Sequence, residues 1–198
     1  MLWKTSRTAE MPEVILEAFR VHLRPPRPED CDAWINLRKE NAAELVPLEP
    51  RWPQDALSKE HFRLRMERQA RHWLEDKAYA FLIFKNRDNT LIGGININHV
   101  CRGAAQYASL GYWLDKDHQK QGLMTESLRR LMPFCFQDIK LHRLHAAVLE
   151  HNTRSIDLLE RIGFKKEGYA EKYIEINGNW ENHILYGLNF EKWGQEKS

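Results

Sequence analysis

Three β-rich stretches in the middle of the chain constrain the fold most, because the third is followed directly by a helix. Residues 79–85 and 90–98 are joined by residues 86–89, an Asn-Arg-Asp-Asn run of residue types that favour turns. A third strand is expected at about 107–114, and it leads through residues 115–122 into a helix. A chain that changes from hairpin-connected strands to a strand followed by a helix is expected to form a mixed α/β sheet.

The remaining elements are predicted from hydrophobic periodicity, helix-start residues and turn dipeptides. They are, in order, a strand that includes Phe19, Val21 and Leu23, a helix begun by residues 28–30, a long helix at 62–74, a helix after residue 122 that Pro133 kinks or shortens, a strand at 144–148, a helix from 152 to 163, and two strands at 164–176 and 180–188 that turn at Asn177-Gly178. The expected order is βααβββαβαββ.

The length favours one elaborated domain. With 198 residues the chain is long for one ordinary domain and short for two, and its 42% apolar residues are enough to fill a single core. We expect an N-terminal arm at 1–18, a domain at 19–192 and a C-terminal tail at 193–198. No apolar run reaches the length of a signal-peptide core or a membrane span, which predicts a cytoplasmic protein without a membrane partner.

The charge balance argues against a dedicated nucleic-acid binder. Thirty basic residues face 28 acidic ones, giving a net charge of +2, whereas such binders are strongly basic. One local cluster remains, on the polar side of the helix at 62–74, and consists of Arg63, Arg65, Arg68 and Arg71. Its two readings are a solvated helix face and a surface that recognises an acidic acceptor or ribosomal RNA.

The cysteines indicate neither a disulfide framework nor a metal site. Cys31, Cys101 and Cys135 are odd in number and scattered, and no CxxC pair occurs. His142 and His145 have no thiols near them in the sequence, so zinc is not expected. This pattern suits a reducing compartment.

The segment between the third strand and its helix has the chemistry of an anion site. Consecutive backbone N–H groups at a helix start converge on a phosphate at the positive end of the helix dipole, and Gly122 permits a close backbone approach. A single glycine before a helix is more often an ordinary turn, and the segment is neither a Walker loop nor a dinucleotide fingerprint. The expected phosphate-binding residues are Gln119, Lys120, Gln121, Gly122, Leu123, Met124 and Thr125.

A second motif makes this signal specific. Asn152-x-x-Ser155 is followed, after seven intervening residues, by Gly163-Phe164. Together with the loop, these residues resemble the acetyl-CoA motifs of the GNAT superfamily. The resemblance implies the α/β GNAT fold, a twisted, mostly antiparallel sheet that is splayed near its fourth strand and flanked by helices. It also implies acetyl-CoA as co-substrate, no metal, a pyrophosphate on the loop and Asn152 facing the pantetheine. The pantetheine is expected to extend the sheet along Gly111–Leu114, that is beside Tyr112, Trp113 and Leu114, whose backbone N–H groups would polarise the acyl carbonyl.

A narrower resemblance covers roughly residues 20 to 190. The segments at 98–103, 110–112, 122–124 and 163–170 look like ribosomal-protein alanine N-acetyltransferases of the RimJ/RimL type, with the RimJ branch nearer. This resemblance implies that the acceptor is a protein N-terminus, such as that of a ribosomal protein.

The catalytic residues of the wider superfamily do not all carry over. Leu159 stands where many members have a catalytic Tyr, so Ser155, at the place of the RimL-type serine, is the expected partner of the departing thiolate. Ile174 replaces the glutamate proposed as base in RimL-type relatives. Glu49, in a Leu-Glu-Pro loop expected to overhang the acceptor, is the preferred base or ammonium anchor. His99 is the second candidate. The alternatives are that Glu49 is a solvated loop carboxylate and that His99 has a structural role.

The lack of an obvious strong acid–base pair favours a protein N-terminus over a lysine as the acceptor. An α-amine has a pKa of about 7.7–8.0 and is partly neutral at cellular pH, whereas a lysine near 10.4 needs a stronger base. Two rival functions stay open, namely acetylation of a polyamine or another small amine, and a non-catalytic acyl-CoA or RNA-binding module. A monomer and a homodimer are both compatible with the sequence.

Overall fold

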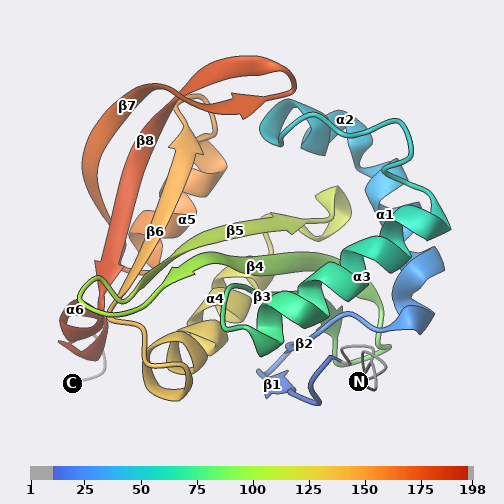
Figure 1. Ribbon diagram of the computed structural model, residues 1–198, viewed down its shortest axis with the longest axis horizontal. Helices are drawn as coiled ribbons and strands as arrows, with labels where there is room; N and C mark the ends of the chain where they lie inside the picture. Colours follow the sequence, from blue (N-terminus) through green and yellow to red (C-terminus); the bar gives the residue numbers. More distant parts are fainter. Residues whose placement is uncertain (1–10, 196–198) are drawn as a thin grey trace, which may run out of the picture.

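The computed structural model describes residues 11–195, which contain one eight-stranded sheet of order β1-β2-β3-β4-β5-β6-β8-β7 (Figure 1). The strands are β1 (Leu16–Glu17), β2 (Val21–Arg24), β3 (Tyr79–Lys85), β4 (Leu91–Cys101), β5 (Tyr107–Leu114), β6 (Arg143–Leu149), β7 (Lys165–Ile176) and β8 (Asn179–Asn189). The helices are α1 (Cys31–Glu40), α2 (Ala42–Leu45), α3 (Lys59–Leu74), α4 (Leu123–Pro133), α5 (Thr153–Arg161) and α6 (Phe190–Gln195), with 3-10 turns η1 (Pro28–Asp30), η2 (Val46–Leu48) and η3 (Lys116–His118) and a π-helical turn η4 (Phe134–Asp138).

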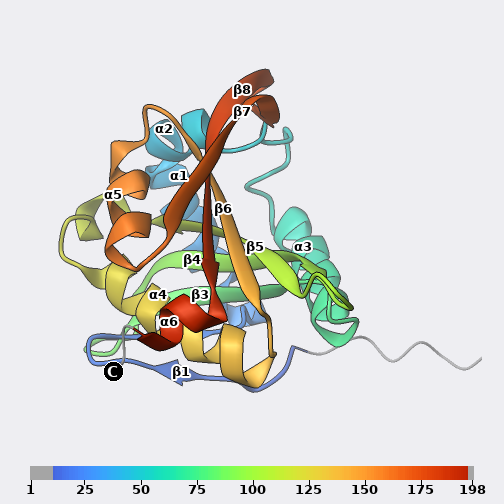
Figure 2. The same cartoon turned by 90° about the vertical axis from the view of Figure 1, so that its left-hand side faces the viewer.

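Helices cover both faces of the central strands, as the sequence of β3 requires. All residues of β3 except the last are buried, and a strand that is apolar on both sides needs cover on both sides. On one face Ile95 and Ile97 pack in a core that includes Leu128 and Leu131 of α4. On the other face lies a second cluster, formed by Trp34, Leu45, Phe62, Leu82, Phe84, Leu91 and Trp113 and supplied with side chains by α1 and α3. Figure 2 shows α3 and α4 on opposite sides of β4 and β5.

The sheet opens between β5 and β6. These are its only parallel neighbours among the described strands, and they pair over three positions that end at Ser109 and His145. Beyond that point β5 still pairs with β4, as far as Leu114 opposite Gly93. The edge of residues 110–114 that faces β6 therefore has no strand partner in the described chain. The splay expected near the fourth predicted strand, at about 107–114, is confirmed.

The hairpin of β7 and β8 closes the far side of this opening. Figure 1 shows its tip next to α2, and the backbone N–H of Asn177 donates to the carbonyl of Glu49 at 2.9 Å. The turn expected at Asn177-Gly178 is present, with Gly178 at φ +88°. The loop after α2 and the hairpin tip thus hold one another in place.

The expected elements differ from the observed ones mainly near the ends of the chain. Phe19 was assigned to the first strand but is 91% exposed and lies outside it, whereas Leu16, within the range expected to be an arm, is buried in strand β1. The short helices α2 and α6 were not expected, and Trp193 of α6 is buried. Pro133 ends α4, and the chain continues as a π-helical turn. Residues 1–10 and 196–198, which include most of the expected arm and half of the expected tail, lie outside the described residues.

The described residues contain no helix that is both long enough and apolar enough to span a bilayer.

Candidate active site

The loop between β5 and α4 presents free backbone donors at the start of α4. Lys120 and Gly122 have positive φ angles of +57° and +77°, and Gly122 is the N-cap residue without a side-chain cap. The first backbone N–H that bonds back to the loop is that of Glu126, to the carbonyl of Gly122 at 3.0 Å. In the described part of the chain, the N–H groups of residues 123–125 have no acceptor. A phosphate would satisfy such donors, so this loop fits the pyrophosphate of a coenzyme A.

Arg20 braces this loop, which was not foreseen from the sequence. Its guanidinium donates to the carbonyl of Gln121 at 2.9 Å and to the carboxylate of Glu126 at 2.7 Å, and its backbone N–H also donates to Glu126, at 2.5 Å. The pKa of Glu126 lies below its usual value: burial opposes ionisation, but these hydrogen bonds outweigh it. Arg20 lies just before β2, far from this loop in the sequence, so no local sequence pattern indicates that it holds the loop.

The side chains of the loop turn back onto the protein and leave the backbone outermost. Gln121 donates to the carbonyl of Asp117 at 2.9 Å, and Gln119 donates to that of Leu114 at 3.2 Å. Arg154 of α5 donates to the side-chain oxygen of Gln119. This contact brings a cation from the far side of the splay to the loop, where it would face a phosphate.

Ser155 and Tyr112 meet across the opening between β5 and α5. Asn152 caps α5, its Oδ1 accepting from the backbone N–H of Ser155 at 3.2 Å. The hydroxyl of Tyr112 donates to the carbonyl of Ser155 at 3.5 Å, and burial raises the pKa of Tyr112 to about 12. A side-chain hydrogen bond with Ser155 opposes this rise, so the two hydroxyl groups lie next to one another.

Trp113 and Arg38 form a wall where α1 packs on the sheet. A Cβ on Gly94 would lie 2.7 Å from the indole nitrogen of Trp113, so a glycine is required for that ring to lie against β4. The guanidinium carbon of Arg38 is 5.1 Å from the ring centre of Trp113 and 4.3 Å from that of Trp52. Arg38 is 9% exposed and its Nε has no hydrogen-bond partner in the described residues.

Glu49 is held firmly beside this wall. Arg38 donates two hydrogen bonds to its carboxylate, at 2.7 and 2.5 Å, and the indole of Trp52 donates a third at 2.8 Å. With its backbone tied to the β7–β8 hairpin, Glu49 is a fixed, partly buried carboxylate and not a solvated loop residue.

His99, in β4, lies beside the beginning of β5, away from Trp113 near its end. It occupies a bulge in β4 with a φ of +54°, is exposed, and shares a hydrogen bond of 3.0 Å with the hydroxyl of Ser109. Ser109 and Trp113 are four residues apart, which is about 13 Å along a strand. His99 and Glu49 therefore cannot both contact the nitrogen of one acceptor amine.

Asn41 and Asp115 fix the acceptor side to the phosphate loop. The amide of Asn41 donates to Asp115 at 2.8 Å and accepts from the backbone N–H of Lys116 at 2.8 Å, while His118 shares a 2.6 Å hydrogen bond with the same carboxylate. Burial opposes ionisation of Asp115, but the hydrogen bonds from Asn41 and His118 outweigh it and hold its pKa below the usual value. No local sequence pattern indicates this contact between the C-cap residue of α1 and the residue that follows β5.

Residues 11–195 contain no group of three or more His, Cys, Asp or Glu side chains placed to hold a metal ion. Cys135 is buried, and burial raises the pKa of its thiol well above the usual range.

Comparisons with known proteins agree with this geometry. The model of the family described as "Acetyltransferase (GNAT) domain" matches residues 20–165. A probable N-acetyltransferase, YjcK of Bacillus subtilis, is 36% identical over 174 residues, covering 88% of this chain and 96% of its own. The [ribosomal protein uS5]-alanine N-acetyltransferase of Escherichia coli is 32% identical over 187 residues, covering 93% and 95%.

Among solved structures, Mycobacterium smegmatis RimJ in complex with CoA-disulfide superposes with a TM-score of 0.82 at 29% identity, covering 86% of this chain and 82% of that one. The family model spans well over half of the chain, and the open edge of β5 agrees with the splay that the family resemblance implies. The chain is an acetyl-CoA-dependent N-acetyltransferase and belongs to the GNAT family.

Proposed function

We propose that this enzyme acetylates the α-amine of a protein N-terminus, with a ribosomal protein as the acceptor and the cytoplasm as the place of reaction. The observation that carries the proposal is the similarity along 93% of the chain to the [ribosomal protein uS5]-alanine N-acetyltransferase. The geometry supports the same acceptor, because the fixed carboxylate of Glu49 suits an ammonium group and the described site has no strong base.

The donor would lie along the open edge of β5. Its pyrophosphate would accept hydrogen bonds from the free backbone N–H groups of residues 123–125, and Arg154 would add a positive charge. From there the pantetheine arm would follow residues 110–114, whose outward peptide groups lack a strand partner. The N–H groups near Tyr112 and Trp113 would polarise the thioester carbonyl.

The chemical step is attack by the neutral amine nitrogen on the thioester carbon, with cleavage of the carbon–sulfur bond. The hydroxyl of Ser155 would stabilise the departing thiolate by a hydrogen bond, which suffices because a thiol has a pKa of about 8.5. Asn152 keeps that serine in place by capping α5. Tyr112 helps from β5 through its bond to the carbonyl of Ser155.

Glu49 would anchor the incoming ammonium group. Three N–H groups already hold its carboxylate in place, so an anchoring role suits it better than that of a strong base. Oε2 accepts from both Arg38 and Trp52, whereas Oε1 accepts a single bond from Arg38 and retains a lone pair for the amine. The proton then leaves through water, and His99, at the other end of β5, would receive it at the surface.

A competition among acceptors tests this function. The purified enzyme is given acetyl-CoA and, in separate reactions, a peptide with a free N-terminal alanine, the same peptide blocked at its N-terminus but carrying a lysine, and spermidine. We expect kcat/KM for the free N-terminus to exceed the others at least tenfold. A faster reaction with spermidine would instead identify a polyamine acetyltransferase, and turnover of none of them, together with salt-dependent RNA binding, would identify a binding module.

A further inference from the structure

One arginine of the long helix α3 points into the protein, although its neighbours face solvent. Arg63 is exposed and forms ion pairs with Glu60 and Glu67 of its own helix. Arg65 is partly buried, and its guanidinium carbon lies 5.5 Å from the ring centre of Trp34. Its position three residues after the buried Phe62 places both on the same helix face, a spacing that is readable in the sequence.

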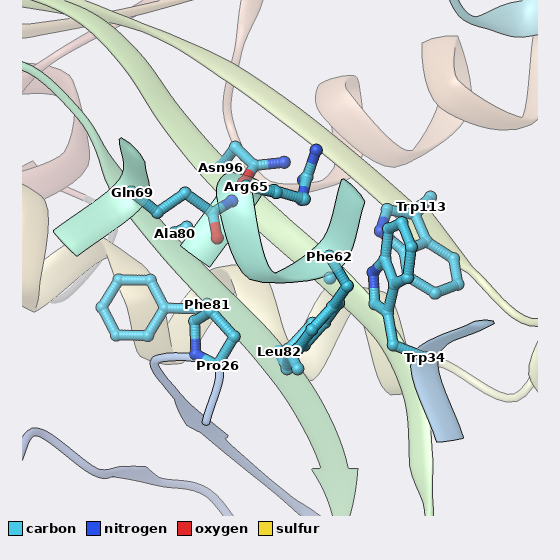
Figure 3. Close-up of a pocket in the computed structure, with 11 residues that line it drawn as sticks. Pro26, Trp34, Phe62, Arg65, Gln69, Ala80, Phe81, Leu82, Asn96 and Trp113 are labelled. Atoms are coloured by element: carbon cyan, nitrogen blue, oxygen red, sulfur yellow. The ribbon is translucent and has the colours of Figure 1, made fainter. Parts of the chain in front are cut away.

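The guanidinium of Arg65 has no hydrogen-bond or ion-pair partner among residues 11–195. Figure 3 shows it in a small pocket, with Gln69 and Asn96 beside it and Trp113 on the other side. The side-chain amides of Gln69 and Asn96 also lack hydrogen-bond partners in the described chain. Three polar groups without protein partners thus meet at one place, and because none of their atoms is fully buried, all three can reach a ligand.

The local charge is positive and uncompensated. Burial first, and then the nearby cations Arg38 and Arg68, lower the pKa of Arg65 to about 10, while Glu49 acts in the opposite direction. Arg65 is therefore still a cation at neutral pH. Glu49 is already bonded to Arg38, so it does not neutralise Arg65. A negatively charged ligand group would restore the balance.

The pocket adjoins the place where the acceptor reacts. Asn96 on β4 is the register partner of Gly111 on β5, within the open edge, and neighbouring strands are about 4.8 Å apart. An extended chain advances about 3.3–3.6 Å per residue. A chain whose first amine lies at the edge near Gly111 would therefore bring its second or third side chain to Arg65.

We propose that Arg65, with Gln69 and Asn96, binds the carboxylate of an acidic side chain at the second or third position of the acceptor protein. This inference rests on the proposed function and specifies its substrate. A cavity of about 10 Å³ has room for roughly one water molecule, which suits one oxygen of an anionic group. Because the proposed acceptor is a protein, a side-chain carboxylate is favoured over a phosphate of ribosomal RNA.

The test uses pairs of peptides within each enzyme variant. Peptides that begin with alanine carry Asp at position 2 or at position 3, and each has a matched Asn version. The ratio of kcat/KM for the Asp and Asn versions is measured for the wild type, for Arg65→Gln, and for Arg63→Gln, the control two residues away in an exposed ion pair. The ratio cancels any general loss of activity.

We expect a wild-type ratio of at least about tenfold for one of the two positions, which corresponds to about 1.4 kcal/mol. Arg63→Gln should keep this ratio, and Arg65→Gln should reduce it to about one. A wild-type ratio near one, or a tenfold ratio that survives Arg65→Gln, overturns the proposal. So does an effect of Arg65→Gln that appears only with intact ribosomal subunits and not with peptides, since it would point to RNA.

Two further measurements distinguish a failure of the Arg65 subsite from an unfolded variant and from a failure of the proposed function. If Arg65→Gln does not fold, the wild type alone decides, because replacing Asp by Lys in the peptide should lower kcat/KM by more than replacing it by Asn. If no peptide is acetylated at its N-terminus, the proposed function has failed. If both versions are acetylated equally, only the Arg65 subsite has failed.

Discussion

Arg38 and Glu49 form a two-point ion pair, with hydrogen bonds of 2.7 and 2.5 Å, between the tryptophan rings and the acceptor side of the opening. The pair joins α1 to the loop after η2, and Glu49 in turn holds the β7–β8 hairpin through its carbonyl. The carboxylate of Glu49 therefore has a structural role, as the partner of Arg38, and is also the proposed ammonium anchor. These two roles have different experimental signatures.

The change Glu49→Gln keeps the shape of the side chain but removes its charge. We expect it to lower kcat/KM, with a loss that shrinks as the pH rises above about 8 and the amine becomes neutral without help. Folding stability should also fall, by about 1–3 kcal/mol, because the buried guanidinium of Arg38 loses its counter-charge. Glu60→Gln, in an exposed pair with Arg63, is the control. A loss in kcat/KM that is the same from about pH 6.5 to 9 would leave Glu49 a purely structural role.

Removing the hydroxyl of Ser155 tests the leaving-group assignment. Ser155→Ala should reduce kcat by about tenfold or more and leave the affinity for acetyl-CoA nearly unchanged, since the cap by Asn152 uses only the backbone N–H of Ser155. Ser155→Thr restores a hydroxyl and should recover part of the rate. Steady-state kinetics measures kcat, and calorimetric titration measures the affinity for acetyl-CoA. Turnover of Ser155→Ala at the wild-type rate, with chemistry rate-limiting, would remove Ser155 from the mechanism.

Gly122 offers a test of the phosphate loop with a closely matched control. Gly122 and Gly103 both have left-handed φ angles, +77° and +71°, which cost an L-residue roughly 1–2 kcal/mol. Gly122→Ala should therefore weaken acetyl-CoA binding at least about tenfold, because the loop must rearrange. Gly103→Ala lies in the turn before β5, with open space around it, and should lower stability without changing affinity. Equal affinities for the two variants would show that the loop does not hold the pyrophosphate.

The contact of Asn41 with Asp115 predicts how stability depends on pH. Because the pKa of Asp115 is lower in the folded protein than the usual value near 3.9, its contribution is fully present above about pH 4 and is lost as the pH falls through the folded pKa. Asn41→Ala should cost about 2–4 kcal/mol at pH 7. In urea titrations the difference between wild type and variant should narrow below pH 4. A difference that is constant with pH would mean that Asn41 acts by packing alone.

Much of the central fold could be predicted from the sequence because its signals are local. The strands at Tyr79–Lys85 and Tyr107–Leu114 have the expected bounds, since continuous apolar runs end at turn residues. The phosphate loop and the cap at Asn152 are likewise encoded by neighbouring residues. Strand β1 has two residues, too few for a periodic pattern, and its place depends on pairing with β2.

The candidate site was harder to predict because several of its contacts join distant segments. Nothing near Arg20 indicates that it braces a loop about a hundred residues later, and nothing near Glu49 indicates that Arg38 holds it. Arg65 is a different case. Its charge predicts a place on the polar side of the helix with Arg63, Arg68 and Arg71, but in the structure it is partly buried against the ring of Trp34. Its spacing of three residues from the buried Phe62 is the one local signal for this position.

The central claim is that the acceptor is a protein α-amine, and mapping the acetyl group tests it most directly. Ribosomal proteins purified without N-terminal acetylation are incubated with the enzyme and acetyl-CoA, and tandem mass spectrometry locates each new acetyl group. We expect one product acetylated on its N-terminal nitrogen, with an acidic residue at position 2 or 3, and unmodified lysines. Acetyl groups on lysine side chains, with every N-terminus left free, would contradict it.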